Sequence, residues 1–187
     1  MGSQLDDEDK SGKFEAIALP HLDAAYNLAR WLTRNDQNAE DLVQMAFMRA
    51  FKFFGGFRGG DARAWLLTIV RNTYYTSLRD NKHEQADICF DEDLHGQDEQ
   101  AQDASPYDIG NNPENILAAR DAKRLVNQGL ESLPQTFREV IVLKELDDLS
   151  YKEIAEIAGI PLGTVMSRLA RGRKLLGEYL KNNAAGG

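Results

Sequence analysis

A long polar segment near the middle of the chain limits the folds available to this sequence. Residues 83–112 read HEQADICFDEDLHGQDEQAQDASPYDIGNN, which is rich in Asp, Glu, Gln and Asn and has no sustained hydrophobic period. Such a segment buries too little apolar surface to offset the entropy lost on ordering its backbone. We therefore expect a flexible acidic linker here, which divides the chain into two separately folded blocks.

Helical patterns mark the sequence on both sides of this segment. Apolar residues recur at helical spacing over 22–32, 42–54 and 65–73. Beyond the linker, Asn112-Pro113-Glu114 has the composition of a helix start, and Ser150-Tyr151-Lys152-Glu153 that of a capping box. No alternating run suggests a strand. The sequence predicts an all-α protein with a tail and helix start over 1–20, a domain over 21–82 and a second domain over 113–181.

Charge is unevenly distributed along the chain. The whole chain has a net charge of −8, yet residues 81–119 carry a net charge of −9, from 1 basic and 10 acidic side chains. Residues 21–80, with 8 basic and 6 acidic side chains, and residues 120–187, with 11 and 9, each have a net charge of +2. Two mildly basic blocks thus flank an acidic connector, so the overall acidity does not exclude a DNA-binding protein.

Cysteine content and hydropathy indicate the compartment. One cysteine, Cys89, excludes an intramolecular disulfide. No apolar run approaches the ~20 residues that a membrane-spanning helix needs. We expect a cytoplasmic protein that does not insert into a membrane.

The segment SYKEIAEIAGIPLGTVMSRLARGRKLL has the form of a helix-turn-helix, with a capped short helix, a turn glycine and a second amphipathic helix. Val165, Leu169 and Leu176 of the second helix should face the protein core. Its other face carries hydroxyl and cationic side chains, which suit the DNA major groove. A merely solvated basic face is the alternative, but the capping box, the turn glycine and the absence of acid before Glu178 favour DNA. The candidate contacts of this helix are Thr164, Ser167, Arg168, Arg171, Arg173 and Lys174.

From Tyr151 to Leu176 the sequence resembles the promoter-binding carboxy-terminal domain of extracytoplasmic-function sigma factors, which give bacterial RNA polymerase its promoter specificity. The resemblance implies that the second helix reads the minus-thirty-five element in the major groove. Met166 occupies a position where some family members carry arginine. The residues at matching DNA-contact positions are Thr164, Ser167, Arg168 and Arg171.

The run NAEDLVQMAF over 38–47 resembles the family motif that docks on the coiled-coil clamp helices of the polymerase's largest subunit. Its polar and thioether side chains fall at helical spacing, displaced from the core face that contains Leu42 and Ala46. Such a stripe can pair with basic side chains and fill an apolar groove. The alternative is that the acidic residues only complement the helix dipole. The candidate polymerase contacts are Asp41, Gln44, Met45 and Met48.

The glycine-containing loop before Trp65 leads into the helix WLLTIVRNTYYTSLR. Opening DNA without ATP requires a pocket for unstacked bases, aromatic stacking surfaces and cations for the backbone. The resemblance implies that this loop and helix recognise the minus-ten element, largely on the non-template strand. We expect Trp65 to lie in the core, and only one of Tyr74 and Tyr75 to face inward. The candidate DNA contacts are Arg58, Asp61, Arg71, Asn72, Thr73, Tyr75 and Arg79.

Two further features bear on mechanism. The resemblance implies that the acidic linker threads through the polymerase active-site cleft, although an acidic segment can also serve only to keep two domains apart.

His83, Cys89 and His95 lack the close ligand pairs of zinc sites. We predict no metal, no cofactor and no catalytic residues, so the chain is not expected to be an enzyme.

The predicted function is that of a sigma factor. Its expected partners are core RNA polymerase, through the clamp helices and the flap, promoter DNA, and an anti-sigma factor; bound to polymerase, it would be associated with the nucleoid. Two alternatives stay open. One is a sigma-like decoy that sequesters an anti-sigma factor, and the other is a simple helix-turn-helix regulator whose amino-terminal block senses a ligand or dimerises.

Overall fold

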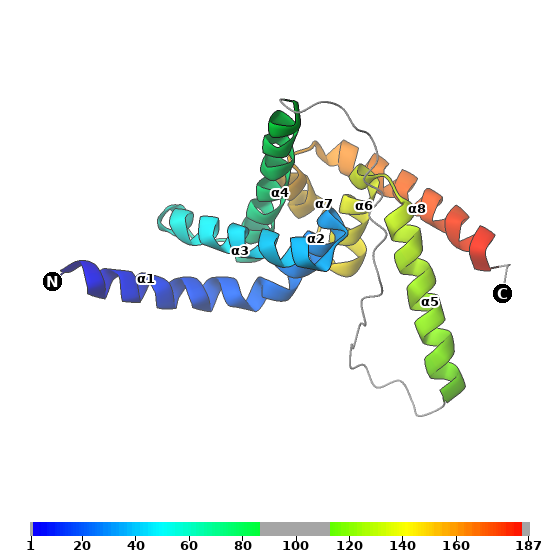
Figure 1. Cartoon of the computed structure of the whole chain (residues 1–187), viewed down its shortest axis with the longest axis horizontal. Helices are drawn as coiled ribbons and strands as arrows, with labels where there is room; N and C mark the ends of the chain where they lie inside the picture. Colours follow the sequence, from blue (N-terminus) through cyan, green and yellow to red (C-terminus); the bar gives the residue numbers. More distant parts are fainter. Residues whose placement is uncertain (1, 87–112, 185–187) are drawn as a thin grey trace.

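The computed structural model describes residues 2–86 and 113–184, with side chains placed over 10–80 and 119–183. Every regular element in these ranges is helical, which confirms the all-α prediction. Figure 1 shows the free end of α1 at one side of the molecule, and α5 and α8 at the other. In chain order the elements are α1 (Gly2–Ala18), the 3-10 turn η1 (Leu19–His21), α2 (Leu22–Thr33), α3 (Asp36–Phe53), the 3-10 turn η2 (Phe54–Gly56), α4 (Ala62–Ala86), α5 (Pro113–Ser132), α6 (Gln135–Ile141), the π-helical segment η3 (Val142–Leu146), α7 (Tyr151–Ala158) and α8 (Leu162–Ala184).

The N-terminal block is a bundle of α2, α3 and α4, which pack on one another in all three pairings. Small alanines let the helix backbones approach closely, and Ala29 and Ala46 are fully buried beside Leu28 and Leu66. The turn between α2 and α3 is set by local chemistry, because the Asn35 side chain accepts a hydrogen bond from the Asn38 backbone N–H at 2.9 Å.

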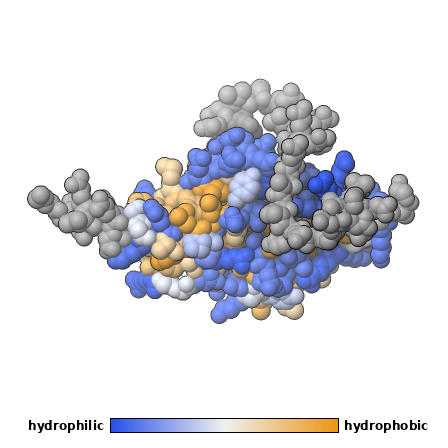
Figure 2. All heavy atoms as spheres, turned by 90° about the horizontal axis from the view of Figure 1, so that it is seen from below, coloured by the Kyte–Doolittle hydropathy of each residue, from blue (hydrophilic) through white to orange (hydrophobic). Residues whose placement is uncertain are grey.

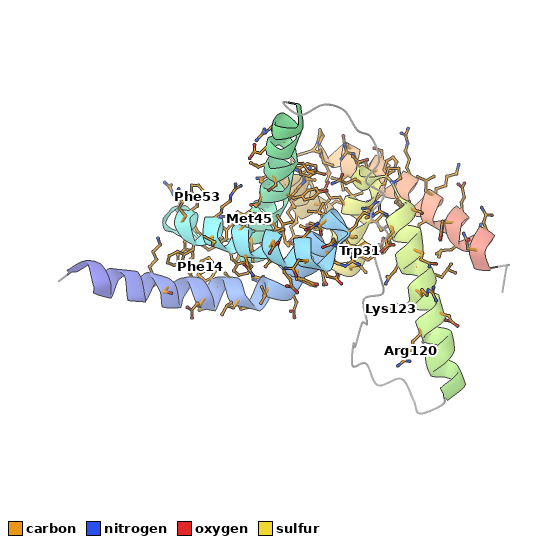
Figure 3. The ribbon with its side chains drawn as sticks, in the orientation of Figure 1. Phe14, Trp31, Met45, Phe53, Arg120 and Lys123 are labelled. Carbon is orange, nitrogen blue, oxygen red and sulfur yellow. The ribbon has the colours of Figure 1, made fainter. Side chains whose placement is uncertain are left out.

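Helix α1 packs along α3, where sequence patterns predict only a tail and helix start. Phe14 is buried, with edge-on ring contacts at centroid distances of 6.2 Å to Phe47, 5.3 Å to Phe51 and 5.4 Å to Phe54. Figure 3 shows Phe14 between the two helices. The Lys10 Nζ lies 4.7 Å from the centroid of the Phe51 ring, a cation–π contact that adds to this packing.

The C-terminal block comprises α5 to α8. Its helix-turn-helix follows the sequence prediction closely. The Ser150 Oγ accepts a hydrogen bond from the Glu153 N–H at 3.2 Å, and the Ser150 N–H donates to the Glu153 carboxylate at 2.6 Å, which completes the capping box. Gly159 ends α7 with a φ of 63°, a left-handed conformation that glycine adopts without a Cβ penalty. Val165 and Leu169 of α8 are buried, as predicted.

Helix α8 lies so close to α6 that only glycine fits at one position. A Cβ on Gly172 would lie 2.9 Å from the Ile141 Cγ1, whereas a Cβ on Gly177 in the same helix would meet nothing within 4 Å. We expect Gly172→Val to lower the free energy of unfolding by ~1–3 kcal/mol through overpacking. Gly177→Ala should raise it by up to about 1 kcal/mol through helix propensity. Urea unfolding followed by circular dichroism distinguishes them, and effects of the same sign would contradict this account.

The two blocks also pack against each other. Helix α4 packs on α7, and α2 packs on α6. One cluster of buried apolar residues includes members of both blocks. Whereas the sequence suggests two separately folded blocks, buried apolar residues of both blocks belong to this one cluster in the structure, and the blocks share an interface.

Candidate promoter and polymerase interfaces

Helix α8 presents most of its predicted DNA contacts to solvent. Ser167, Arg171, Arg173 and Lys174 are exposed, whereas Thr164 and Arg168 are half-buried. In addition, the Ser167 hydroxyl donates to the Thr164 carbonyl at 3.1 Å, so its oxygen can still accept a hydrogen bond. The exposed side of the helix therefore carries these hydroxyl and cationic side chains over three turns, together with the exposed Met166, while Val165 is buried.

The cations of α8 differ in their intramolecular partners. The Arg173 guanidinium donates to one Glu145 carboxylate oxygen at 2.9 and 2.6 Å, and these hydrogen bonds raise its pKa. The Lys174 Nζ lies 4.0 Å from the Glu178 carboxylate. Arg171 has no ion pair with any residue that the structure describes. Arg171 is therefore the cation, of these three, that is most available to a DNA base.

The α3 stripe, which we define as Asp41, Gln44, Met45 and Met48, is exposed along its whole length. Met48 is 73% exposed and Met45 is 42% exposed, while Leu42 and Ala46 beneath them are buried. Phe53, at the end of the same helix, is 61% exposed. Met45 and Phe53 are labelled on α3 in Figure 3. In the view of Figure 2, apolar side chains gather mainly on the half that holds the N-terminal block, within an otherwise largely hydrophilic surface.

The loop before α4 contains two glycines in the left-handed region and borders a hollow. Gly59 and Gly60 have positive φ values of 87° and 104°. A hollow of about 320 Å³ lies beside the loop and is lined partly by Phe57 and Trp65. Its wall also includes Glu156 from α7, so the C-terminal block contributes an acidic side chain to it. This acid would repel a DNA backbone entering the hollow.

Asp61 has a structural role in this loop. Its carboxylate accepts a hydrogen bond from the Ala64 N–H at 3.0 Å, so it caps the amino end of α4. That backbone hydrogen bond is the main reason that the pKa of Asp61 is lowered. The neighbouring Arg58 is exposed. The loop thus combines a fixed cap with a cation that faces solvent.

Two arginines of α4 are held by carboxylates of the C-terminal block. Arg71 forms an ion pair with Glu139, whose side chain is 1% exposed. The Arg63 guanidinium donates to the Asp147 Oδ1 at 3.0 Å, and the Asp147 side chain is 3% exposed. Burial raises the pKa of Asp147, and Arg63 partly opposes this shift. We call these two ion pairs the interblock clasp.

Tyr75 lies on the same face of α4 as Arg71 and contacts both members of the Arg71–Glu139 pair. Its hydroxyl donates to the Glu139 Oε2 at 3.4 Å, and the Arg71 guanidinium carbon lies 4.5 Å from the centroid of its ring. Burial, followed by the nearby charge of Glu139, raises the pKa of Tyr75 to about 12. Tyr74 is also half-buried, so neither ring is free for stacking in this arrangement.

The other predicted contacts of α4 divide between surface and core. Asn72 and Arg79 are exposed. Thr73 is fully buried, and its hydroxyl donates to the Ile69 carbonyl at 2.7 Å. A DNA contact at Thr73 is therefore ruled out in this arrangement, because the residue belongs to the apolar period of the helix.

Comparisons with known proteins agree with this two-part organisation. The family model for Sigma-70 region 2 matches residues 17–84, and that for Sigma-70, region 4 matches residues 123–176. The ECF RNA polymerase sigma-E factor of Haemophilus influenzae is 34% identical over 158 residues, which cover 80% of this chain and 77% of that protein. The chain belongs to the ECF family of RNA polymerase sigma factors. As such, it directs polymerase to promoters.

Other members of the ECF sigma factor family are similar over most of their length. The sigma-E factor of Escherichia coli K12 is 34% identical over 145 residues, covering 73% of this chain and 70% of that protein. Among solved structures, the sigma factor RpoE from Bartonella quintana, in complex with the anti-sigma factor NepR, matches with a TM-score of 0.68 and 30% identity, covering 90% and 97% of the two chains. CnrH, in complex with the cytosolic domain of CnrY, shares the fold at 24% identity with a TM-score of 0.59.

Sequence reasoning missed the acidic side of the clasp in this sigma factor. Arg138 and Glu139 interrupt the apolar run from Phe137 to Leu143, which was the available signal. Arg138 is buried, and it donates to the backbone carbonyl of Trp31 in α2 at 3.2 Å. It also donates to three carbonyls at the turn between α5 and α6, those of Leu130, Glu131 and Leu133.

The described residues provide neither the ligand grouping of a metal site nor a membrane-spanning helix. Among the described residues, no three His, Cys, Asp or Glu side chains are grouped as a metal site would require. Cys89 and His95 lie outside the described residues, and the side chain of His83 is not placed. None of the helices in the described part of the sigma factor has the length and apolar character needed to cross a membrane.

Proposed function

We propose that this sigma factor docks on core polymerase through the α3 stripe, holds the minus-ten element with α4 and its preceding loop, and reads the minus-thirty-five element with α8. One observation carries the proposal: the exposed α3 stripe and the exposed cationic face of α8 occur in one chain, within the ranges that match sigma regions 2 and 4. The sigma region 2 match also accounts for the α3 stripe and for the loop before α4, which a simple helix-turn-helix regulator would leave without a role.

Engagement of the minus-ten element requires the two blocks to separate. Arg71 and Tyr75 are occupied by Glu139, and Glu156 closes one side of the loop pocket. Promoter contact at these positions therefore needs α4 to move away from α6 and α7, so that the 21–82 and 113–181 domains act as separate units. The proposed minus-ten contacts are Arg58, Arg71, Asn72, Tyr75 and Arg79, with Asp61 holding the loop.

The proposed mechanism uses binding energy alone. The chain performs no reaction of its own, needs no cofactor, and acts in the cytoplasm and on the nucleoid because its polymerase works there. The linker is proposed to thread through the polymerase cleft, and the 113–181 domain to reach the flap; residues 87–112 of the linker lie outside the described residues. The acidic charge of the linker supports this path, because a nucleic-acid channel is basic.

An anti-sigma factor is the proposed negative regulator. The related RpoE of Bartonella quintana is solved in complex with the anti-sigma factor NepR. In this chain the exposed α3 stripe offers an inhibitor a mixed apolar and acidic surface. A helical inhibitor on that surface would exclude the polymerase clamp.

Run-off transcription tests the proposed function. Core polymerase supplemented with this chain should start transcripts at defined positions on genomic fragments, whereas core polymerase alone should not. Stable binding to core polymerase, measured in parallel, separates a sigma factor from a decoy. A chain that binds an anti-sigma factor but neither binds core polymerase nor supports specific transcripts would be a decoy.

A further inference from the structure

The outward face of α8 is divided into an apolar half and a polar half. Leu162, Met166 and Ala170 follow one another at intervals of four residues, so they form a row along the helix. Met166 is 53% exposed and Leu162 is 49% exposed. We call these three residues the apolar row. The row runs beside the buried side of the helix, where Val165 and Leu169 face the core; Leu162, three residues before Val165, lies nearest to that side, and Met166 and Ala170 lie further from it.

A polar row runs beside the apolar row, one residue further along. It consists of Gly163, Ser167 and Arg171, all of them exposed, and Lys174 continues it on the following turn. A Cβ on Gly163 would meet nothing within 4 Å, so the first turn of this row is unobstructed. The two rows together form one surface about three turns long, with methyl and thioether groups on one side and a hydroxyl and cations on the other.

This division of the face matches the chemistry of the DNA major groove. Thymine is the base that carries a methyl group there, whereas guanine offers acceptors that suit arginine and phosphates attract any cation. Methionine is flexible and polarisable, so it adapts well to a small apolar group. The cations beside the apolar row favour DNA over a protein partner, since an acidic backbone complements them.

We propose that Met166 is a specificity-determining residue of this sigma factor, whose thioether, together with Leu162 and Ala170, packs on the C5-methyl groups of one or two thymines in the minus-thirty-five element. This inference rests on the proposed function of α8. Ser167 and Arg171 contact the polar base edges or phosphates beside those thymines. The helix thus selects thymine by apolar contact at the position where an arginine would select guanine.

Replacing single thymines with deoxyuridine tests this proposal, because deoxyuridine lacks only the methyl group. The experiment uses holoenzyme formed from the full chain and core polymerase, with promoter duplexes chosen by run-off transcription. At one or two positions of the minus-thirty-five element, deoxyuridine should weaken binding by about 3- to 5-fold, as expected for the loss of one buried methyl. Met166→Ala holoenzyme should bind the thymine and deoxyuridine duplexes equally at those positions.

Three matched variants separate methyl recognition from other roles of the helix. Met166→Leu should keep the preference for thymine, because it preserves an apolar side chain. Arg171→Ala should weaken binding to both duplexes and leave their ratio unchanged. Leu175→Ala changes an apolar residue of the same helix that is 38% exposed but lies outside the apolar row, and it should also preserve the ratio.

The results that would overturn thymine recognition by Met166 differ from those that would overturn the proposed function. Equal thymine-to-deoxyuridine ratios for the unmodified and Met166→Ala holoenzymes would overturn the inference, as would a preferred element whose thymines can all be replaced without loss. A Met166→Ala effect confined to polymerase or anti-sigma binding would assign the apolar row to a protein partner instead. If no holoenzyme forms or no promoter is bound, the proposed function itself fails.

Discussion

Neutralising the two carboxylates of the interblock clasp should separate the blocks of the free sigma factor. Glu139→Gln together with Asp147→Asn removes the charges that hold Arg71 and Arg63. Leaving a buried charge without its partner costs about 3–5 kcal/mol, and the cost at Arg63 is smaller because its side chain is 31% exposed. Since both carboxylates belong to the C-terminal block and both arginines to the N-terminal block, this cost falls on the packed arrangement.

Two measurements on the full chain check this expectation. The distance between spin labels at Arg49→Cys and Lys181→Cys, in a Cys89→Ser background, should lengthen and broaden in the double variant. Affinity of the free protein for a single-stranded minus-ten oligonucleotide should rise by about tenfold or more, because Arg71 and Tyr75 become accessible.

A control variant removes the same amount of charge from the surface. Asp121→Asn together with Asp148→Asn neutralises two exposed carboxylates that take no part in the clasp. It should leave the label distance unchanged and alter oligonucleotide binding only slightly. If the clasp variant and the control behave alike, the clasp does not hold the blocks together.

Charge reversal on the α3 stripe should weaken the complex with core polymerase. Asp41→Lys places a cation on the surface proposed to meet basic side chains of the clamp, and like charges facing each other across an interface are strongly unfavourable. We expect affinity to fall by about 10- to 100-fold in a fluorescence competition assay. Glu40→Lys is the matched control, because Glu40 is also exposed but lies outside the stripe. It should retain most of the affinity.

The same variant tests the competition between polymerase and the proposed inhibitor. If an anti-sigma factor covers the α3 stripe, Asp41→Lys should weaken that complex as well. Binding of the inhibitor and of core polymerase should then be mutually exclusive. A stable ternary complex of the three would contradict occlusion of the stripe.

Features that depend on neighbouring residues were predicted well from the sequence. The start of α5 at Pro113, the capping box at Ser150 and the turn at Gly159 each arise from chemistry within a few residues. The exposed face of α3 and the buried side of α8 follow from the helical period. The caps and turns, like the buried and exposed helix faces, are determined by residues within the same short stretch of chain that shows the sequence pattern.

Features that depend on distant residues were not predicted. Arg71 and Glu139 are 68 positions apart, and Arg63 and Asp147 are 84 apart, so no local pattern reveals their pairing. Thr73 is a different case. The resemblance to the family places it among the DNA contacts, whereas its spacing from Ile69 and Val70 puts it on the buried side of α4.

The clasp makes the domain interface a competitor for the promoter. If Arg71 and Tyr75 contact the minus-ten element as proposed, each serves either Glu139 or DNA, and the molecules in solution are divided between a packed population and an open one. A ligand that needs the open population binds with its intrinsic affinity multiplied by the open fraction; at an open fraction of about 1%, that is roughly a hundredfold loss. By the same linkage, a partner that recognises both blocks in their packed arrangement avoids this loss. The relative affinities of polymerase and the proposed inhibitor would then depend on Glu139 and Asp147, two buried residues outside the α3 stripe.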